Sequence, residues 1–340
     1  MPAKKQTPEM EKTAVKEPVE KPKKNLVWWF NRILYDRILL LIAMITLLIV
    51  LMSFTYPREF PTWPNFAAVM LDTAQGGIIT TGMLVLLICG VFDLSAGNIL
   101  ALSGIVAGIL VADLETPVFV AILGGILTGL VVGIVNGLII TKLRINALIT
   151  TLAMSGILRG VTQIISPAGV ANLPDPFKPF GQVKLLGLQS PFWYMLMVVL
   201  VAWFLLSRTR FFRQFYYVGS NAKAATLSGI KVPTVTLVGF AIMGTLAGFA
   251  GTVLASRLSN AVVLAGTGIE LRAITAAILG GASLSGGQGT VPGAFLGVLF
   301  VSLIQNALII LRVPVFYQGI VVGIVLLVAI GIDQFGHAKK

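Results

Sequence analysis

Residues 284–288 spell LSGGQ, which is the signature motif of ATP-binding-cassette ATPases. Such an ATPase also needs a phosphate-binding loop, in which a lysine directly follows a glycine-rich turn. No glycine in this chain is followed by lysine, so that loop is absent. The motif lies between two apolar segments, and we expect it to form a glycine-rich turn and not a nucleotide site.

Polar side chains that could contact a polar solute lie inside or at the edges of apolar segments. They are Asp93, Asn98, Asn136, Arg159, Gln163, Glu270, Arg272, Gln305 and Asn306. Charged groups at membrane depth are costly and usually face a bundle interior or a water-filled path. We expect a solute pathway to use Asp93, Asn98, Asn136 and Glu270. Hydrogen bonds that hold neighbouring helices together explain each amide equally well.

The sequence lacks the residue sets of the common catalytic and metal sites. Its one cysteine, Cys89, excludes an internal disulfide and a cysteine metal cluster, and its one histidine, His337, lies near the C-terminus. It contains no HExxH motif and no acidic pair typical of an aspartyl protease. We therefore expect a chain that is not an enzyme and binds no metal or cofactor of its own.

Segment 208–232 is the longest polar-rich stretch between two apolar segments. Within it, Asn221 can cap a short helix rich in alanine, and Gly229 can end that helix. A short helix with a small-residue face is suited to docking in a groove of a partner protein. The alternative is an ordinary loop at a membrane surface.

The composition requires a membrane. Hydrophobic residues make up 56% of the 340 residues and charged residues only 11%, and the mean hydropathy is +0.93. Charged residues make up about 25% of a typical soluble domain, so lipid must act as the solvent for most of this chain. The net charge of +12 fits basic loops at a membrane surface, and no basic face interleaved with aromatic residues indicates nucleic-acid binding.

The expected fold is an all-α bundle of about ten membrane-spanning helices, because each span needs about 20 apolar residues. The predicted spans are 38–56, 67–90, 95–112, 117–140, 146–165, 192–207, 233–256, 264–282, 293–311 and 315–333. Residues 28–336 form the predicted transmembrane domain. We expect residues 1–27, which are rich in charge and proline, to be a disordered tail, and residues 337–340 to be a short second tail.

With ten spans, most basic residues fall on one side of the membrane. That side holds both tails, Lys142, Arg144 and segment 208–232. Positive residues gather on cytoplasmic loops, so we expect both termini and segment 208–232 to lie in the cytoplasm.

A weak internal repeat occurs at an offset of 190 residues. Residues 131–135 and 321–325 both read VVGIV, while Leu94, Ser95 and Gly97 match Leu284, Ser285 and Gly287. We interpret the two matches in one register as duplication of a unit of four or five helices, which is common in transporters.

Four blocks of sequence occur in order between residues 60 and 335: GVFDLSAG at 90–97, GIVNGLII with the following RIN and ITTL at 133–152, GSNAKAATLSGI at 219–230, and GIEL with LGGASLSGGQG at 268–289. Together they resemble the permease subunits of bacterial sugar ATP-binding-cassette importers, of the ribose, galactose and xylose type. The resemblance implies a multi-pass protein of the bacterial cytoplasmic (inner) membrane, in contact with membrane lipid.

The resemblance also implies partner proteins. They are a second permease, in a homodimer or a heterodimer, ATPase subunits that hold ATP and magnesium, and an extracytoplasmic sugar-binding protein. The residues implied to dock on the ATPase are Gly219, Asn221, Ala224, Ala225, Leu227, Ser228, Gly229 and Ile230. This chain departs from the family pattern at Ala222 and Lys223, where acidic residues are common, and at Ala147, which replaces a proline.

Two alternatives remain open at this point. The same framework could carry a nucleoside, a signalling furanose or a branched-chain amino acid. An ion-coupled secondary carrier would keep the helices and the repeat but would not need a docking segment.

Overall fold

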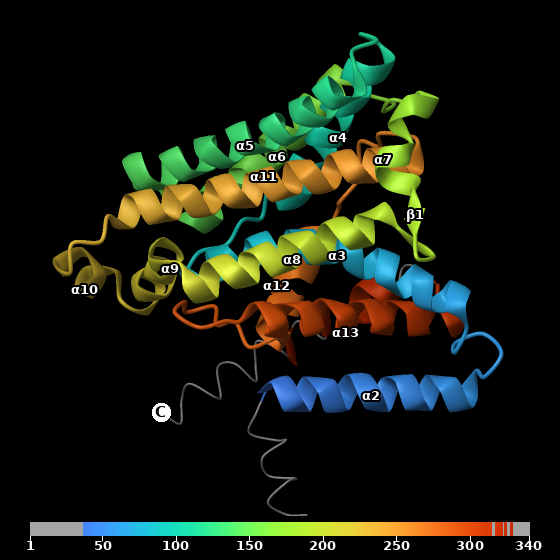
Figure 1. Cartoon of the computed structure of the whole chain (residues 1–340). Coiled ribbons are helices and arrows are strands. Elements are labelled where there is room, and N and C mark those ends of the chain that lie inside the picture. Colours follow the sequence, from blue (N-terminus) through green and yellow to red (C-terminus); the bar gives the residue numbers. More distant parts are fainter. Residues whose placement is uncertain (1–36, 315–316, 322, 325–326, 329–340) are drawn as a thin grey trace, which may run out of the picture.

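The computed structural model describes residues 37–314, 317–321, 323–324 and 327–328, and it is almost entirely helical (Figure 1). The helices are α2 Arg37–Thr55, α3 Trp63–Ile88, α4 Ala96–Ala112, α5 Val118–Lys142, α6 Ala147–Ile165, α7 Pro179–Gln182, α8 Ser190–Arg208, α9 Arg210–Ser220, α10 Ala222–Leu227, α11 Val232–Leu258, α12 Ile269–Leu279 and α13 Val291–Ile310, with a 3₁₀ turn η1 at Asp175–Phe177. Strands β1 Lys184–Leu185 and β2 Leu188–Gln189 form one small antiparallel hairpin.

Seven helices in the described part of the chain are long and apolar enough to cross a membrane, and α4 is a shorter apolar helix. The predicted all-α polytopic bundle is therefore confirmed, and each of the predicted spans from 38–56 to 293–311 contains a helix. The predicted span 315–333 lies partly outside the described residues, and the predicted tails 1–27 and 337–340 lie wholly outside them. The total of ten spans stays a prediction.

The predicted span 264–282 is wrong as a single crossing helix. Helix α12 has 11 residues, which at 1.5 Å per residue span about 16 Å, roughly half of the hydrocarbon core. Gly266 and Gly268 have φ angles of 74° and 78°, and Gly281 has a φ of 93°, so the helix cannot continue in either direction. The chain leaves α11 and returns into the bundle before α12 begins (Figure 1).

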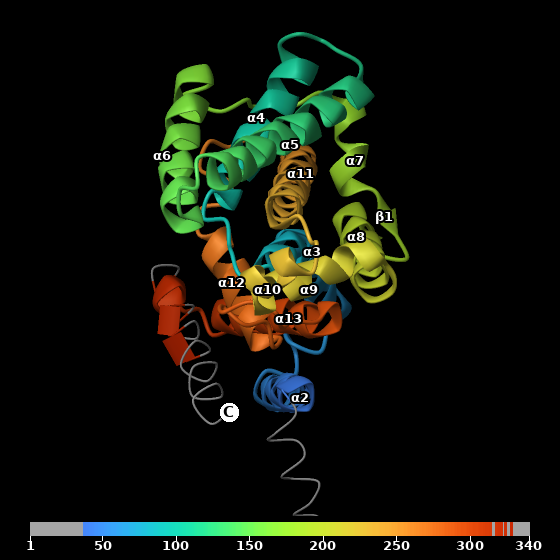
Figure 2. The ribbon, with the colours of Figure 1, turned by 90° about the vertical axis from the view of Figure 1, so that its left-hand side faces the viewer.

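Helix α11 runs through the middle of the bundle, with α4 and α5 on one side and α3 on the other (Figure 2). Glycines let α11 and α5 approach closely. A Cβ atom at Gly129 of α5 would overlap the carbonyl oxygen of Gly244 and lie 2.7 Å from the Cα atom of Gly248. Small residues at such contacts bring backbones together, which is how helices associate where lipid removes the hydrophobic driving force.

Helices α12 and α13 pack on α3, and α2 lies outermost against α13. The outer face of α2 is apolar and open, with Leu47 68% exposed and Phe54 84% exposed. An apolar face of this kind is stable in contact with lipid and not with water. The membrane therefore surrounds the bundle on the side of α2.

We expect Gly129→Ala to lower the thermal unfolding midpoint of the purified protein in detergent. The added methyl group would push α5 away from α11, and overpacking of this kind costs about 1–3 kcal/mol.

The matched control is Gly160→Ala in α6, where a Cβ atom would meet nothing within 4 Å. Alanine is a better helix former than glycine by about 1 kcal/mol, so the midpoint of this variant should stay constant or rise. Equal midpoints in the two variants would contradict the close packing of α5 on α11.

Candidate functional site

The turn from α9 to α10 forms as the sequence predicts. The side-chain oxygen of Asn221 accepts a hydrogen bond from the backbone N–H of Ala224 at 3.0 Å, Ala225 is buried, and Gly229, with a φ of 82°, follows the helix. The predicted capped short helix is confirmed. Its docking role stays a prediction.

The surface of this turn combines apolar and basic side chains. Leu227 is 90% exposed and Tyr217 is 57% exposed. Segment 208–232 contains no acidic residue, and its five basic residues are all exposed: Arg208, Arg210, Arg213, Lys223 and Lys231. Helices α5 and α8 end, and α11 begins, at the same end of the bundle as α10, which we call the α10 end (Figure 1). Such a surface is complementary to an acidic partner with an apolar pocket.

Gly219, in the last turn of α9, joins the α9–α10 turn to the bundle. A Cβ atom there would overlap the carbonyl oxygen of Ile88 and lie 2.5 Å from the backbone nitrogen of Gly287. Gly287 N–H itself donates to the Ile88 carbonyl at 2.9 Å, and the Tyr216 hydroxyl donates to the carbonyl of Gly289 at 3.0 Å. The α9–α10 turn therefore contacts the turn that follows α3 and the turn that follows α12.

These two turns, 89–95 and 280–290, also contact each other. A Cβ atom at Gly286 would lie 2.8 Å from the Cα atom of Gly90. Residues 284–288, which spell LSGGQ, form part of this packed glycine-rich turn, as the sequence predicts. Leu94 and Ser95 of the first turn match Leu284 and Ser285 of the second at an offset of 190 in the sequence.

Of the predicted pathway residues, Asp93 and Asn136 are completely buried. One carboxylate oxygen of Asp93 accepts from the backbone N–H of Ser95 at 2.7 Å and from its hydroxyl at 2.5 Å. The Asn136 amide donates to the same hydroxyl at 3.0 Å. This network fixes the start of α4 against α5 and is closed to solvent in this conformation.

Asn98 is partly exposed and belongs to a second polar group, which we call the α6 cluster: Asn98, Ser155, Arg159, Thr267 and Glu270. The Asn98 amide donates to the Ser155 hydroxyl at 2.6 Å. Arg159 Nε donates to the Asn98 side-chain oxygen at 3.0 Å, and Arg159 Nη2 donates to the Thr267 hydroxyl at 3.2 Å. Helices α4 and α6 and the segment before α12 thus meet at one polar site.

Glu270, in the first turn of α12, completes the α6 cluster. A Cβ atom at Gly97 would lie 2.5 Å from its carboxylate oxygen, so the carboxylate lies directly against α4. Glu270 also interacts electrostatically with Arg159. The structure therefore brings together Asn98 and Glu270, two of the four predicted pathway residues, in a partly exposed group, whereas Asp93 and Asn136 are buried. The two groups are neighbours, because Glu270 also interacts electrostatically with Asp93.

Sequence reasoning missed two contributors. Arg159 was noted only as a polar residue in an apolar segment, and Asp72 was not noted, although it lies inside the predicted span 67–90. Asp72 forms an ion pair with Arg272 at 2.8 Å between oxygen and nitrogen, linking α3 to α12. The signal in the sequence is that two apolar segments each contain a charged residue, an acidic one at Asp72 and a basic one at Arg272, which indicates that the two could pair.

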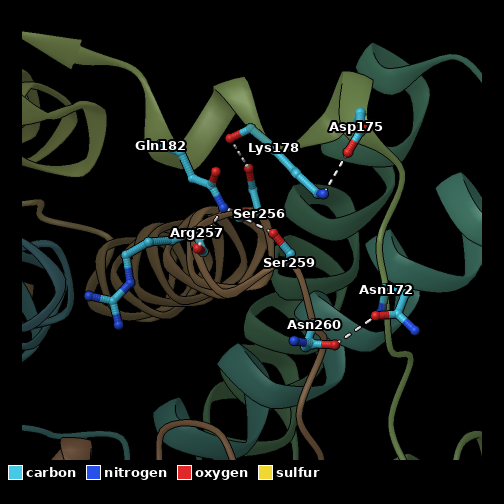
Figure 3. A network of polar contacts seen from close by, with 8 residues as sticks. All are labelled: Asn172, Asp175, Lys178, Gln182, Ser256, Arg257, Ser259 and Asn260. Atoms are coloured by element: carbon cyan, nitrogen blue, oxygen red, sulfur yellow. Dashed lines mark hydrogen bonds and ion pairs between the residues drawn. The ribbon is translucent and has the colours of Figure 1, made fainter.

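At the other end of the bundle, the segment between α6 and α8 covers the end of α11 (Figure 3). The Gln182 amide donates to the carbonyl of Arg257 at 3.0 Å and to the Ser259 hydroxyl at 2.9 Å, and the Ser256 hydroxyl donates to the Phe177 carbonyl at 2.6 Å. On the outer surface, Lys178 pairs with Asp175 and holds the pKa of that carboxyl below its usual range. This end therefore has a rigid polar cap.

The chain combines membrane-crossing helices, polar groups at breaks between helices and an exposed helical turn at one end of the bundle. This combination is typical of a membrane transport subunit. Residues 65–330 match the family model described as branched-chain amino acid transport system, permease component. The chain therefore belongs to this family of transport permeases.

Curated relatives match most of the chain. The chain is 37% identical over 299 residues to the ribose import permease protein of Escherichia coli K12, covering 86% of this chain and 92% of the relative. It is 40% identical over 292 residues to the ribose import permease protein of Bacillus subtilis strain 168, covering 85% and 90%. It is 35% identical over 283 residues to the L-arabinose transport system permease protein of Escherichia coli K12, covering 83% and 86%.

We expect Asp72→Arg and Arg272→Asp each to lower the thermal unfolding midpoint, because each places like charges side by side between α3 and α12. The pair is partly exposed, so each single change should cost about 1 kcal/mol or slightly more. The double exchange restores opposite charges at this pair and should recover part of the loss, as measured by a double-mutant cycle in detergent; recovery is incomplete because Asp72 also interacts with Arg257. Simple addition of the two single effects would contradict a direct ion pair.

Proposed function

We propose that this chain is the membrane-spanning permease subunit of an ATP-binding-cassette importer that moves a monosaccharide into the bacterial cytoplasm. The observation that carries the proposal is its similarity, over more than four fifths of its length, to permeases named for ribose and arabinose. The chain has no phosphate-binding loop of its own, so ATP and magnesium belong to a partner ATPase. A second permease, identical or related, and an extracytoplasmic sugar-binding protein complete the proposed transporter.

The proposed orientation in the inner membrane follows from charge. The α10 end carries Lys142, Arg144 and the basic segment 208–232, and positive loops favour the cytoplasmic side. With ten spans and a duplicated helical unit, both termini lie on that side as well. The polar cap around Gln182 then faces the extracytoplasmic binding protein.

The proposed mechanism is alternating access driven through the α9–α10 turn. ATP binding and hydrolysis move the ATPase subunits, on which segment 219–230 docks. Gly219 leaves no space between this segment and the turns after α3 and α12, so a displacement of α10 must shift one or both turns. The turn after α3 leads directly into the start of α4, so this displacement reaches Asp93 and Asn98. The turn after α12 follows the helix whose first turn carries Glu270, so a shift of that turn moves α12 as a whole.

The charge of the docking segment also predicts the charge of the ATPase surface that it contacts. Ala222 and Lys223 stand where related permeases often have acidic residues, and segment 208–232 has five basic residues and no acidic residue. The complementary surface on the ATPase therefore carries carboxylates around an apolar pocket for Leu227. Opposite charges at the edge of this interface increase the rate at which the permease and the ATPase associate, and their effect weakens as the salt concentration rises.

A second candidate cargo is a branched-chain amino acid, because the matching family model is described by that substrate. Nucleosides and signalling furanoses fit the same framework. An ion-coupled secondary carrier is the remaining alternative, and it differs in its energy source.

Reconstitution tests the proposal directly. The permease, its ATPase and its binding protein are placed in proteoliposomes, and uptake of D-ribose, L-arabinose and leucine is measured with and without MgATP. We expect ATP-dependent uptake of a sugar that a protonophore does not abolish. Sugar uptake without the ATPase would contradict the proposed function, and ATP-dependent uptake of leucine alone would assign the amino acid as cargo.

Two substitutions test the role of the docking segment. Asn221→Ala removes the cap of α10, which costs about 1 kcal/mol of helix stability, and Gly229→Val places a β-branched residue at a positive φ. We expect both variants to insert in the membrane and to lose most of the ATPase stimulation that sugar-loaded binding protein causes, measured in proteoliposomes.

The control is Lys142→Gln, an exposed position at the same end of the bundle but outside the segment. It should keep the full stimulation. Undiminished uptake in both Asn221→Ala and Gly229→Val would show that the segment is not the coupling element.

A further inference from the structure

The α6 cluster lies on an open flank of the bundle. Helices α6 and α12 occupy the same flank (Figure 2), and the bond between Arg159 and Thr267 is exposed on it. The neighbouring α6 side chains Leu152 and Ile157 are also exposed, at 59% and 57%. A half-buried charged arginine thus lies on a membrane-spanning helix that also exposes apolar side chains.

This flank cannot face hydrocarbon in the working transporter. Arg159 interacts electrostatically with Glu270 but, among the described residues, has no carboxylate within ion-pair distance, and a charged arginine in lipid is costly. The non-helical segment 261–268 ends beside it. Non-helical backbone at membrane depth occurs only where protein buries it or where it lines a water-filled cavity. Since Thr267 in this segment is exposed, the structure favours water.

There is also room beside the cluster. Gly156 lies about one turn before Arg159 on α6 and Gly160 directly follows it, and a Cβ atom at either would meet nothing within 4 Å. Most glycines of α5 and α11, such as Gly129 and Gly244, are instead in tight contact with neighbouring backbone. The α6 glycines therefore are not used for packing within this chain, and they leave space next to the polar groups.

The side chains of the cluster suit a neutral, hydroxyl-rich solute. Arg159 only donates hydrogen bonds and Glu270, when ionised, only accepts them, whereas Asn98, Ser155 and Thr267 do both. A sugar hydroxyl likewise donates and accepts, so it can use every member of the set. Arg159 and Glu270 have opposite charges, and the carboxyl of Asp93 also interacts electrostatically with Glu270, so the site has no excess of positive charge and disfavours an anionic solute.

We propose that Arg159, together with Asn98, Ser155, Thr267 and Glu270, forms a water-exposed site that contacts the hydroxyl groups of the sugar as it crosses the membrane. This site rests on the proposed function. In this proposal the residues that contact the sugar lie on the α6 flank, and the buried Asp93 and Asn136 do not contact it. Arg159 then helps to determine which solute crosses the membrane.

Thiol labelling tests whether water reaches the α6 cluster. The one native cysteine, Cys89, is buried, so a Cys89→Ala parent provides an unreactive background. Ser155→Cys and Thr267→Cys are made in this parent, in the full transporter in proteoliposomes, and labelled with a methanethiosulfonate reagent that carries a trimethylammonium group. Leu127→Cys on α5, a position that is 52% exposed on an apolar helix surface, is the matched control.

We expect both cluster thiols to react at least about tenfold faster than the Leu127→Cys thiol, because only a thiol in water ionises and reacts. D-ribose or L-arabinose, whichever the parent transports, should slow labelling severalfold when binding protein and MgATP are present. Labelling of both cluster thiols as slow as that of the control would overturn the proposal. Labelling that sugar leaves unchanged during transport would overturn it too.

Arg159→Gln adds a functional measurement. Loss of a hydrogen bond from a charged donor should lower sugar uptake about tenfold or more, while Arg159→Lys should retain an intermediate rate and ATP hydrolysis should continue in both. Uptake in Arg159→Gln equal to the parent would count against the site. Absence of ATP-dependent sugar uptake in the parent would instead contradict the proposed function.

Discussion

The lack of water in the bilayer core is the constraint on which this structure depends. Every backbone N–H and carbonyl group at membrane depth must find a partner inside the protein, so the chain crosses the membrane as helices. A helix can break only where other protein groups or water supply the missing hydrogen bonds. The breaks lie at 89–95, 259–268 and 280–290. Backbone bonds across the breaks, such as that from Gly287 to Ile88, satisfy part of this need. Several polar side chains lie at or beside these breaks, among them Asp93, Thr267 and Glu270, where they find partners at neighbouring helices.

Close packing of backbone on backbone limits how far neighbouring helices can shift independently, which the proposed mechanism uses. Where Gly129 and Gly244 bring α5 against α11, no side chain can yield, so a force applied to one helix passes to the other. The same argument holds at Gly219, which is held between the turns after α3 and α12. A conformational change that starts at α10 therefore cannot be absorbed locally, and packed contacts of this kind switch between discrete arrangements instead of deforming continuously.

Hydropathy predicted the helices of this fold because long apolar runs have one stable form in lipid, and the cap and end of α10 followed from Asn221 and Gly229. The broken crossing at 264–282 was missed because composition measures hydropathy and not backbone conformation. Only the positive φ angles of Gly266 and Gly268 reveal that the helix starts late. The ion pair of Asp72 with Arg272 and the bond of Arg159 with Asn98 join residues far apart in sequence. No spacing rule relates such residues, so these contacts depend on packing that the sequence does not display.

The four predicted pathway residues divide into two pairs with different positions, and the start of α4 connects the two pairs. Asp93 and Asn136 are sealed, and through Ser95 they fix the first turn of α4. The next residues of α4 are Gly97, which lies against Glu270, and Asn98, which binds Arg159. Because α4 starts at a break, its first turn lacks a preceding helix to hold it in place. The buried network supplies that restraint, so the sealed residues position the exposed ones.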